Sequence, residues 1–431
     1  MLYDNLGVND QGHLTFAGMD TVMLARRYGT PLFLMDEQRL RSRCREYIKA
    51  MEQYLPAGSK PLYASKALSF KAIYRIMEQE RMGIDVVSPG ELHTAVAAGY
   101  NMENAYFHGN SKTDADIRFA ISHKIGCIVS DVAEEIDAID REAQRQGICQ
   151  NVLLRLSPGI DPHTHDKIST GSIDCKFGAV IENGQALELV RHTLGKQHIR
   201  LLGYHCHIGS QIFDHTPFCD AAVIMLQFLA QVKQTLGFEA PVLNLGGGMA
   251  VPYTAADVAI DYTANIRAIG QLIENTCAQL GIAAPAILME PGRSIVADSG
   301  ITLYGVTGTK KIPGFKNYAA VDGGMTDNPR YTLYEAKYTV LCANRMREEK
   351  NFLCTVAGRC CESGDLIQEN VAIPEPERGD LLAVLTTGAY NYSMASNYNR
   401  IPRPPVVMVR DGNSYEAVRR ETLEDLTQYD V

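Results

Sequence analysis

The sequence lacks a long uninterrupted apolar segment. Its most apolar run, residues 221–232, contains Gln227 and Gln231 and is too short to span a bilayer. Near the N-terminus, no stretch combines a basic start with an apolar core, so we expect no secretory signal. We therefore expect a protein that has no membrane as a partner.

The sequence also lacks a cysteine framework. Its 11 cysteines are odd in number, scattered, and without a Cys-x-x-Cys pair. This usage argues against disulfides and favours free thiols in a reducing compartment, so we predict a cytoplasmic location. Cys360 and Cys361 are the one adjacent pair.

The sequence has fewer basic than acidic residues. There are 41 Lys and Arg against 50 Asp and Glu, a net charge of −9, which argues against nucleic acid and anionic membranes as partners. A hydrophobic content of 46% and a charged content of 21% are typical of a globular protein. A length of 431 residues predicts about two domains, or a barrel with an appendage.

Short apolar runs alternate with helical patterns from residue 61 onward. The expected strands lie at 61–66, 84–87, 105–108, 127–130, 152–156, 201–207, 242–245 and 287–289. The helical patterns between them lie at 70–79, 90–98, 114–124, 133–145, 186–194, 217–236 and 262–280. Eight parallel βα units predict an α/β fold, a TIM-type (β/α)8 barrel, with an open doubly wound sheet as the rival.

The alternation stops after about residue 293. Apolar runs at 301–305, 318–321, 352–356, 381–385 and 406–409 are separated by Gly, Pro and Asn turns, which is typical of an antiparallel β domain. We expect an N-terminal segment (1–31) that contributes to this domain, a barrel (32–293) and a C-terminal β domain (294–431).

Polar and reactive side chains follow the expected strands. They are Lys66, Ser88, Asn110, Asp131, Arg155, His205 with His207, Gly246 to Gly248, and Glu290 with Arg293. Because a barrel builds its active site at the carboxyl ends of its strands, these groups are expected on one face. Taken alone, Lys66 fits a strand-end lysine whose amine reaches water better than a desolvated amine that attacks a carbonyl.

Three of these sites favour a flat, phosphorylated cofactor. Gly246 to Gly248 allow backbone amides to approach a phosphate, although three glycines can also form a simple turn. The run has neither the dinucleotide-binding nor the Walker spacing. A buried Glu290 could keep a pyridine nitrogen protonated, and Arg293 could bind a carboxylate or phosphate; a plain salt bridge is the alternative.

His205 and His207 would face the same side of a strand. They could bind a metal together with His163 and His165, but carboxylates and cysteines at ligand spacing are absent nearby, so we predict no metal. An imidazole stacked on a cofactor ring, with Ser210 donating to a phosphate, fits this pattern better.

Five motifs together resemble the alanine-racemase-fold (fold-type III) family of pyridoxal 5'-phosphate (PLP) decarboxylases. They are Tyr63-Ala-Ser-Lys66-Ala, Asp85-Val-Val-Ser-Pro-Gly-Glu91, His207-Ile-Gly-Ser-Gln211, Gly246-Gly-Gly248 and Glu290-Pro-Gly-Arg293. Further motifs are similar to the diaminopimelate decarboxylases within that family: Thr164 to Gly171, Lys176-Phe-Gly178, Asp322 to Asp327, Arg330 to Tyr334, Cys361-Glu-Ser-Gly-Asp365, Gly388-Ala-Tyr390 and Ser396 to Asn399. The resemblance runs from about residue 20 to residue 410 in unbroken order.

The resemblance implies a role for each matching residue. Lys66 would bond to the PLP aldehyde, His207 would stack on the ring and Glu290 would hold its nitrogen. The rest of the cofactor site would be Ser210, Gly246, Gly247, Gly248, Pro291, Gly292, Arg293 and Tyr390. The residues that would bind the substrate are Arg293, Arg330, Tyr334, Glu362 and Tyr390. Cys361 would donate a proton from the neighbouring subunit of a homodimer.

The implied reaction is decarboxylation of meso-2,6-diaminopimelate to L-lysine, the last step of lysine biosynthesis. Arg and Glu suit the two ends of such a substrate, because one binds a carboxylate and the other an ammonium. A decarboxylase acting on ornithine, arginine or carboxynorspermidine and a non-catalytic PLP-binding homologue are the alternatives. A metal-dependent hydrolase is more distant. The chain departs from the family pattern at Leu68, where many relatives carry Asn, and at Arg359-Cys360, where a Pro is often found.

Overall fold

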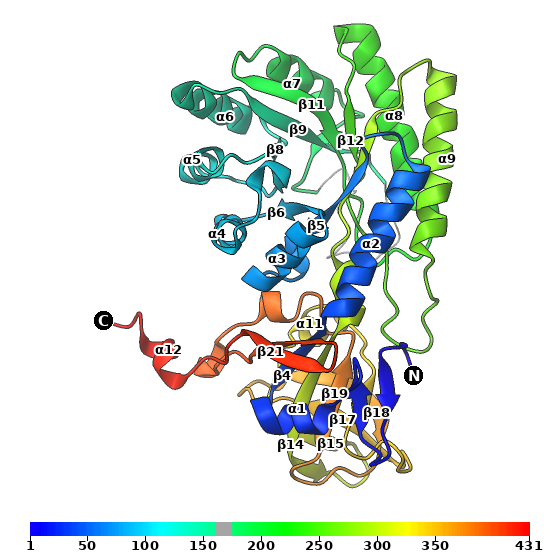
Figure 1. Ribbon diagram of the computed structural model, residues 1–431, viewed down its shortest axis with the longest axis vertical. Helices are drawn as coiled ribbons and strands as arrows, with labels where there is room; N and C mark the ends of the chain where they lie inside the picture. Colours follow the sequence, from blue (N-terminus) through cyan, green and yellow to red (C-terminus); the bar gives the residue numbers. More distant parts are fainter. Residues whose placement is uncertain (161–174) are drawn as a thin grey trace. The chain divides into compact units, whose positions relative to one another are not determined.

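The barrel is a closed ring of eight parallel strands. The computed structural model describes residues 1–160 and 175–431 (Figure 1). The ring consists of β5 (Lys60–Ala64), β6 (Gly83–Val86), β7 (Ala105–Phe107), β8 (Cys127–Ser130), β9 (Gln150–Ser157), β11 (Ile199–His205), β12 (Val242–Asn244) and β13 (Ala286–Met289). The strands pair in the order β9-β11-β12-β13-β5-β6-β7-β8, and β8 also pairs with β9, which closes the ring. The barrel expectation is confirmed, and the open sheet is wrong.

Helices connect the strands and lie outside the ring (Figure 1). They are α3 (Lys71–Gln79), α4 (Pro89–Ala98), α5 (Asp114–Ser122), α6 (Ala133–Gln146), α7 (Gln185–Leu194), α8 (Thr216–Leu236) and α9 (Tyr262–Leu280). Local signals explain the ends of some of these helices. In α4, the Ser88 side chain accepts a hydrogen bond from the amide of Glu91, Pro89 occupies the first turn, and Gly99 ends the helix in the left-handed conformation at φ 79°.

Apolar side chains fill the interior of the ring. They are Leu62, Tyr106, Cys127, Val129, Leu153 and Leu288, all buried. Strands that are buried on both faces read as continuous apolar runs, which explains why the pattern in the sequence located them. With the interior packed, polar groups collect only at the strand ends.

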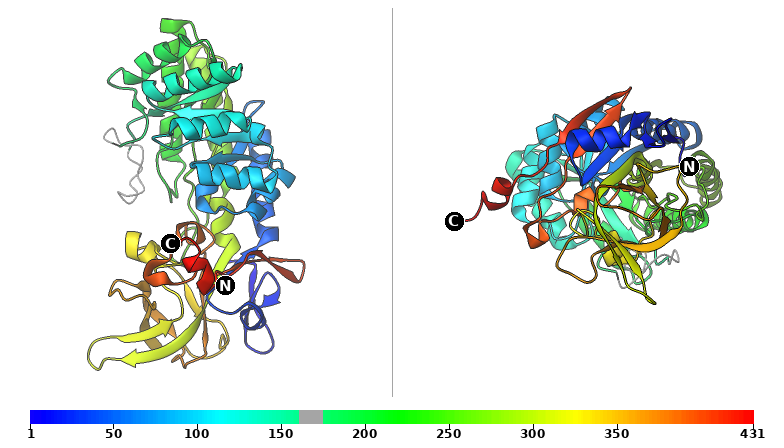
Figure 2. Two further views of the ribbon diagram at one scale, coloured as in Figure 1. Left: turned by 90° about the vertical axis from the view of Figure 1, so that its left-hand side faces the viewer. Right: turned by 90° about the horizontal axis from the view of Figure 1, so that it is seen from below.

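A second sheet forms the core of a separate unit. Its strands are β4 (Leu32–Asp36), β14 (Gly300–Lys311), β15 (Asn317–Val321), β16 (Val340–Cys342), β17 (Phe352–Ala357), β18 (Leu366–Ile373), β19 (Leu381–Leu385), β20 (Val406–Arg410) and β21 (Asn413–Val418). The main path is β18-β17-β15-β14-β4-β20-β21, and β19 pairs with both β14 and β16. The pairs β15–β17 and β20–β4 are parallel and the others antiparallel, which confirms a mainly antiparallel domain. The β14–β15 hairpin is the long yellow-green ribbon of Figure 2.

The N-terminus completes this unit. β1 (Leu6–Val8), β2 (Leu14–Phe16) and β3 (Met19–Asp20) form a small sheet, and α1 (Thr21–Tyr28) begins at Asp20, whose side chain accepts from two backbone amides. Leu14, Phe16 and Leu24 pack in one buried cluster with residues of β4, β14 and β19.

The chain forms two compact units. The sheet unit comprises residues 1–42, 251–259 and 293–431, and the barrel unit comprises residues 43–250 and 260–292. α2 (Glu37–Tyr54) begins in the first and ends in the second. The boundaries expected at 31/32 and 293/294 remain predictions. None of the helices in the described ranges is both long and apolar enough to cross a membrane.

Candidate active site

Lys66 lies at the mouth of the barrel. It follows β5 in a single turn of 3-10 helix (Ser65–Ala67), whose other two residues are buried. Its side chain lines a cavity of about 390 Å³, within the size range of small-ligand sites. The cavity is lined by Lys66, Asp85, Val87, His108, Gly109, Asn110, Ser111, Arg155, Lys176, Phe177, His205, His207 and Glu290. These residues come from the carboxyl ends of successive strands, as the barrel geometry requires.

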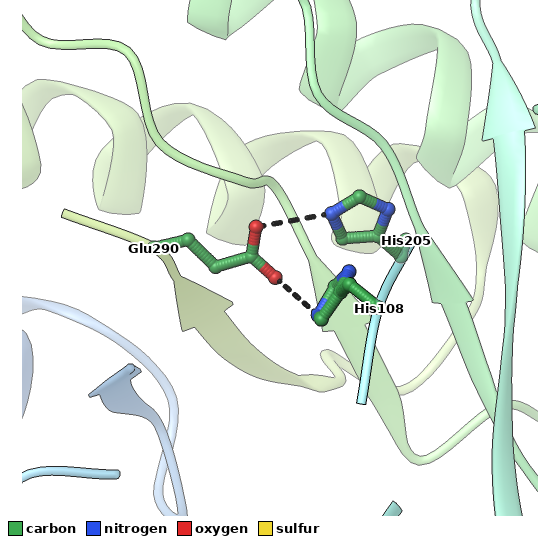
Figure 3. A group of neighbouring side chains, drawn as sticks. All are labelled: His108, His205 and Glu290. Carbon is green, nitrogen blue, oxygen red and sulfur yellow. Dashed lines mark hydrogen bonds and ion pairs between the residues drawn. The ribbon is translucent and has the colours of Figure 1, made fainter. Parts of the chain in front are cut away.

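The carboxylate of Glu290 contacts three polar side chains, and Figure 3 shows two of them. Its Oε1 accepts a hydrogen bond of 2.6 Å from Nδ2 of Asn244 and lies 3.0 Å from Nε2 of His108. Its Oε2 lies 3.2 Å from Nε2 of His205. Burial opposes ionisation, but the contacts with His108 and His205 outweigh it and hold the pKa of Glu290 well below its usual range. Glu290 is therefore an ionised carboxylate in a buried site.

His207 presents a neutral imidazole to the same cavity. Burial, together with the positive charges of Lys66 and Arg155, lowers its pKa well below the usual value. A neutral ring keeps an aromatic face, which suits stacking on a heteroaromatic cofactor. The structure thus brings Lys66, His207 and Glu290 together around one space.

The glycine run packs tightly behind this space. A Cβ on Gly247 would meet the carbonyl oxygen of Glu290 at 2.0 Å, and one on Gly248, at φ 127°, would meet that of Gly209 at 2.4 Å. The amide of Gly246 donates to Oδ1 of Asn244 at 2.8 Å. Among the described residues, none accepts a hydrogen bond from the amides of Gly247 and Gly248. These two amides are suited to a phosphate.

The remaining cofactor residues in the barrel unit adjoin these groups without lining the cavity. The carbonyl of Pro291 accepts from the amide of Ala64 at 3.1 Å, and Gly292 approaches Ala64 so closely that a Cβ would lie 2.9 Å from its Cβ. Ser210 is half-buried in the loop that follows β11. An electrophilic ring with an aldehyde, a basic nitrogen and a phosphate fits this donor set: Lys66, Glu290, His207 and two glycine amides.

The sheet unit carries the other predicted residues. Arg293 is 5% exposed, its Nη1 donates to the hydroxyl oxygen of Tyr253 at 2.7 Å, and its guanidinium lies 4.8 Å from the ring centre of Tyr390. Arg330 lies 5.4 Å from the same ring and 5.1 Å from that of Tyr334. Tyr390 has φ 62°, which costs a bulky side chain roughly 1–3 kcal/mol. Two buried guanidiniums around one strained tyrosine form a site suited to a carboxylate or phosphate.

The two adjacent cysteines differ in exposure. Both lie in the loop between β17 and β18. Cys360 is buried, and burial together with Asp365 raises its pKa to about 11. Cys361 and Glu362 are exposed, and the amide of Cys361 donates to Oδ1 of Asn399 at 2.7 Å. The resemblance assigns the proton donor to Cys361, which remains a prediction, and a reactive thiol is better served by its exposure than by the burial of Cys360.

Several residues of the two sites escaped the sequence analysis. Asp85, His108 and Asn244 were given no role, although each stands at or next to a strand end, where the rule that found Lys66 applies equally. Tyr253 lies in an irregular segment, and no pattern marks it. His163, His165 and the Thr164–Gly171 motif lie outside the described residues.

The chain is similar to proteins of known function. The family described as "Pyridoxal-dependent decarboxylase, pyridoxal binding domain" matches residues 38–297. The diaminopimelate decarboxylase of Bacillus subtilis is 45% identical over 98% of this chain and 96% of its own length, and that of Staphylococcus aureus is 41% identical over 97% of each. The crystal structure of M. jannaschii diaminopimelate decarboxylase in complex with L-lysine superposes with a TM-score of 0.91 at 33% identity, covering 99% of this chain and 98% of that one.

Proposed function

The chain belongs to the diaminopimelate decarboxylase family of pyridoxal-dependent decarboxylases, and on that premise we propose that it converts meso-2,6-diaminopimelate to L-lysine and CO₂, the last step of lysine biosynthesis. The observation that carries this proposal is the convergence of Lys66, His207 and Glu290 on one cavity at the barrel mouth. PLP, when bound, supplies an electron sink for the electron pair left at the α-carbon as CO₂ departs.

The residues of the barrel unit prepare this chemistry. Lys66 offers the amine that bonds to the cofactor aldehyde. Glu290, ionised and buried, stabilises a proton on the ring nitrogen, which increases electron withdrawal. His207, neutral, would pack its ring against the cofactor face, and the Gly247 and Gly248 amides with Ser210 would donate to the phosphate.

The residues of the sheet unit recognise the distal end of the substrate. Arg293 and Arg330 bind its second carboxylate, with Tyr334 and Tyr390 packed on their guanidiniums. Tyr390 would also help to hold the cofactor phosphate, as the family resemblance implies. Glu362 binds the second ammonium. A substrate of the ornithine or arginine type has no distal carboxylate and would present its distal cation differently. Cys361 returns a proton to the α-carbon.

The protein acts as a homodimer in which Cys361 and Glu362 serve the partner's cavity. Their exposure in the β17–β18 loop supports this assignment, because a thiol that completes a site in the other subunit must reach the surface of its own. A cytoplasmic location is supported by the thiols, since all 11 cysteines are free.

A substrate panel tests the proposal. The protein, loaded with PLP, is incubated with meso-diaminopimelate, ornithine, arginine and carboxynorspermidine, and CO₂ and the amine products are measured. We expect lysine and CO₂ from diaminopimelate at a kcat/KM above that of every other substrate. The Lys66→Ala variant should lose both turnover and the visible absorbance of bound PLP. Faster turnover of another member of the panel, or PLP absorbance without CO₂ from any of them, would overturn it.

A further inference from the structure

Side chains from three strands of the ring converge on the carboxylate of Glu290. His108 follows β7, His205 ends β11 and Asn244 ends β12. All three are buried, with exposed fractions of 4%, 1% and 0%. Asn244 already donates to Oε1, so the two imidazoles are additional partners, one on each oxygen (Figure 3). A carboxylate has about four acceptor positions, and the hydrogen bonds from Asn244 and His205 leave room on it for a ligand.

Both contacts favour a proton on Nε2 of the imidazole, as a hydrogen-bond donor in His205 and as a close polar approach in His108. Nε2 of His108 lies between two carboxylates, 3.0 Å from Oε1 of Glu290 and 3.8 Å from Oδ1 of Asp85. A bare nitrogen lone pair at this position would face oxygen lone pairs in a buried site, which is unfavourable. Nε2 of His205, 3.2 Å from Oε2, is subject to the same requirement.

His205 meets this requirement in its neutral form. Burial lowers the pKa of His205 to about 4, so this imidazole donates from Nε2 without adding positive charge at neutral pH. A cationic partner would compete with a protonated ring nitrogen for the charge of Glu290. A neutral donor orients the carboxylate and leaves its charge for the ligand.

We propose that His108 and His205 are positioning residues, which hold the carboxylate of Glu290 in one orientation for the ring nitrogen of PLP. The inference rests on the proposed function for the identity of the cofactor. It assigns to both histidines a role beyond filling the barrel mouth: they determine how strongly the site distinguishes a ring nitrogen from a ring C–H.

A cofactor analogue isolates this role from catalysis. The full-length protein, freed of PLP, is titrated by equilibrium dialysis with PLP and with 1-deazapyridoxal phosphate, which carries C–H in place of the ring nitrogen. We expect the wild type to bind PLP at least roughly tenfold more tightly, as for a buried hydrogen bond to a charged group. His108→Leu and His205→Leu, which lack a donor, should reduce this ratio to below about threefold.

The conservative variant and a surface control complete the design. His108→Gln and His205→Gln place an amide N–H near the position of Nε2 and should recover most of the discrimination. His192→Gln is the matched control, because Nε2 of His192 also contacts a carboxylate, that of Asp137 at 2.7 Å, but on the surface of α7. It should bind both compounds as the wild type does. If the Leu variants fail to fold, judged by circular dichroism, Asn replaces Leu, since its shorter amide cannot reach Glu290.

Each outcome is decisive. Leu or Asn variants that keep the wild-type ratio, or Gln variants that lose as much as Leu variants, overturn the positioning role. A wild type that binds PLP and the analogue equally well shows that Glu290 does not contact the ring nitrogen, and the inference fails while the cofactor assignment stands. A wild type that binds neither overturns the proposed function itself.

Discussion

Nη1 of Arg293 donates a hydrogen bond of 2.7 Å to the hydroxyl oxygen of Tyr253. Tyr253 is itself anchored: its amide donates to Oδ2 of Asp257 at 2.8 Å and its carbonyl accepts from Thr339 at 2.9 Å. Its ring packs edge-on against that of Tyr338, with centroids 5.4 Å apart. A residue from an irregular segment thus fixes the guanidinium that we assign to the substrate carboxylate.

Removing the hydroxyl of Tyr253 should weaken substrate binding. In Tyr253→Phe, the guanidinium of Arg293 loses a buried partner and its orientation, so we expect KM for diaminopimelate to rise roughly tenfold or more, with a smaller change in kcat. Steady-state kinetics measure the split. Tyr204→Phe is the control, because the Tyr204 hydroxyl is buried and hydrogen-bonds to none of the described residues. An unchanged KM in Tyr253→Phe would contradict the assignment.

A methyl group on Gly247 should displace the end of the eighth strand. The new Cβ would lie 2.0 Å from the carbonyl oxygen of Glu290, so either the backbone moves or the chain loses stability, by about 1–3 kcal/mol or more. We expect Gly247→Ala to bind PLP more weakly and to unfold at lower urea concentration. Gly308→Ala, where an added Cβ meets no atom within 4 Å, serves as control. Equal behaviour of the two variants would refute the steric argument.

The two adjacent cysteines should respond differently to substitution. Cys361→Ser replaces the exposed thiol with a weaker acid and should lower kcat by about 100-fold or more while the absorbance of bound PLP is retained. Cys360→Ser buries a hydroxyl instead and should cost stability, about 1–3 kcal/mol, with kcat within about threefold of the wild type. Stopped-flow kinetics and urea unfolding separate the two effects. The reverse pattern would assign the proton donor to Cys360.

Mixing inactive subunits tests whether sites are shared. Lys66→Ala and Cys361→Ala subunits are each inactive as homodimers, but a mixed dimer combines the intact Lys66 of one subunit with the intact Cys361 of the other. Random exchange of equal amounts should restore about a quarter of the wild-type activity, because half of the dimers would be mixed and each would hold one complete site. Subunit exchange is verified by mass spectrometry. Exchange without recovered activity argues against a shared site.

A buried carboxyl in the sheet unit should make stability depend on pH. Burial, opposed by the Tyr304 hydroxyl and the Gly324 amide, raises the pKa of Asp327 from 3.8 to about 7. The folded protein therefore binds a proton that the unfolded chain releases between these values. The stability that this proton gives the folded state is present in full below pH 3.8 and falls as pH rises towards 7. Above pH 7 the free energy of unfolding no longer changes because of Asp327, and the total change is up to about 4 kcal/mol.

The Asp327→Asn variant removes this dependence. Relative to the wild type, its free energy of unfolding should rise as pH increases from 4 to 7 and level off above, as measured by urea unfolding at fixed ionic strength. Asp425→Asn is a suitable comparison on the surface, where Arg419 and the Thr422 amide lower the pKa of the carboxyl instead. A difference between Asp327→Asn and wild type that is independent of pH would show that Asp327 is ionised in the folded state throughout.

The barrel could be predicted from the sequence because its strands are buried on both faces and several of its helices carry local end signals. α9 illustrates this: it extends from Tyr262 to Leu280, the range expected, with Asp261 as its cap and Gly281 at its end. In the sheet unit, the sequence did not predict β18 and β21. β18 alternates irregularly between buried and exposed residues, and β21 has no buried residue. Neither forms an apolar run.

Partners in space could not be predicted from pattern alone. The run Leu32–Asp36 looks like any barrel strand, being fully buried, yet it pairs with β14 and β20. The contact of Tyr253 with Arg293 joins residues 40 positions apart without a shared element. The unequal exposure of Cys360 and Cys361 is likewise a property of the folded loop, because the two are adjacent residues of the same type.

The pairing of β4 has a consequence for how the chain matures on the ribosome. This strand is made early, but the strands on its two sides begin at Gly300 and Val406, after the whole barrel. At synthesis rates of about 5–20 residues per second, the apolar segment waits for many seconds with both edges unpaired. The barrel can close in that interval, because all of its strands precede Gly300. Nascent chains stalled before residue 300 should therefore hold a folded barrel and an N-terminal strand that is open to chaperones or to aggregation.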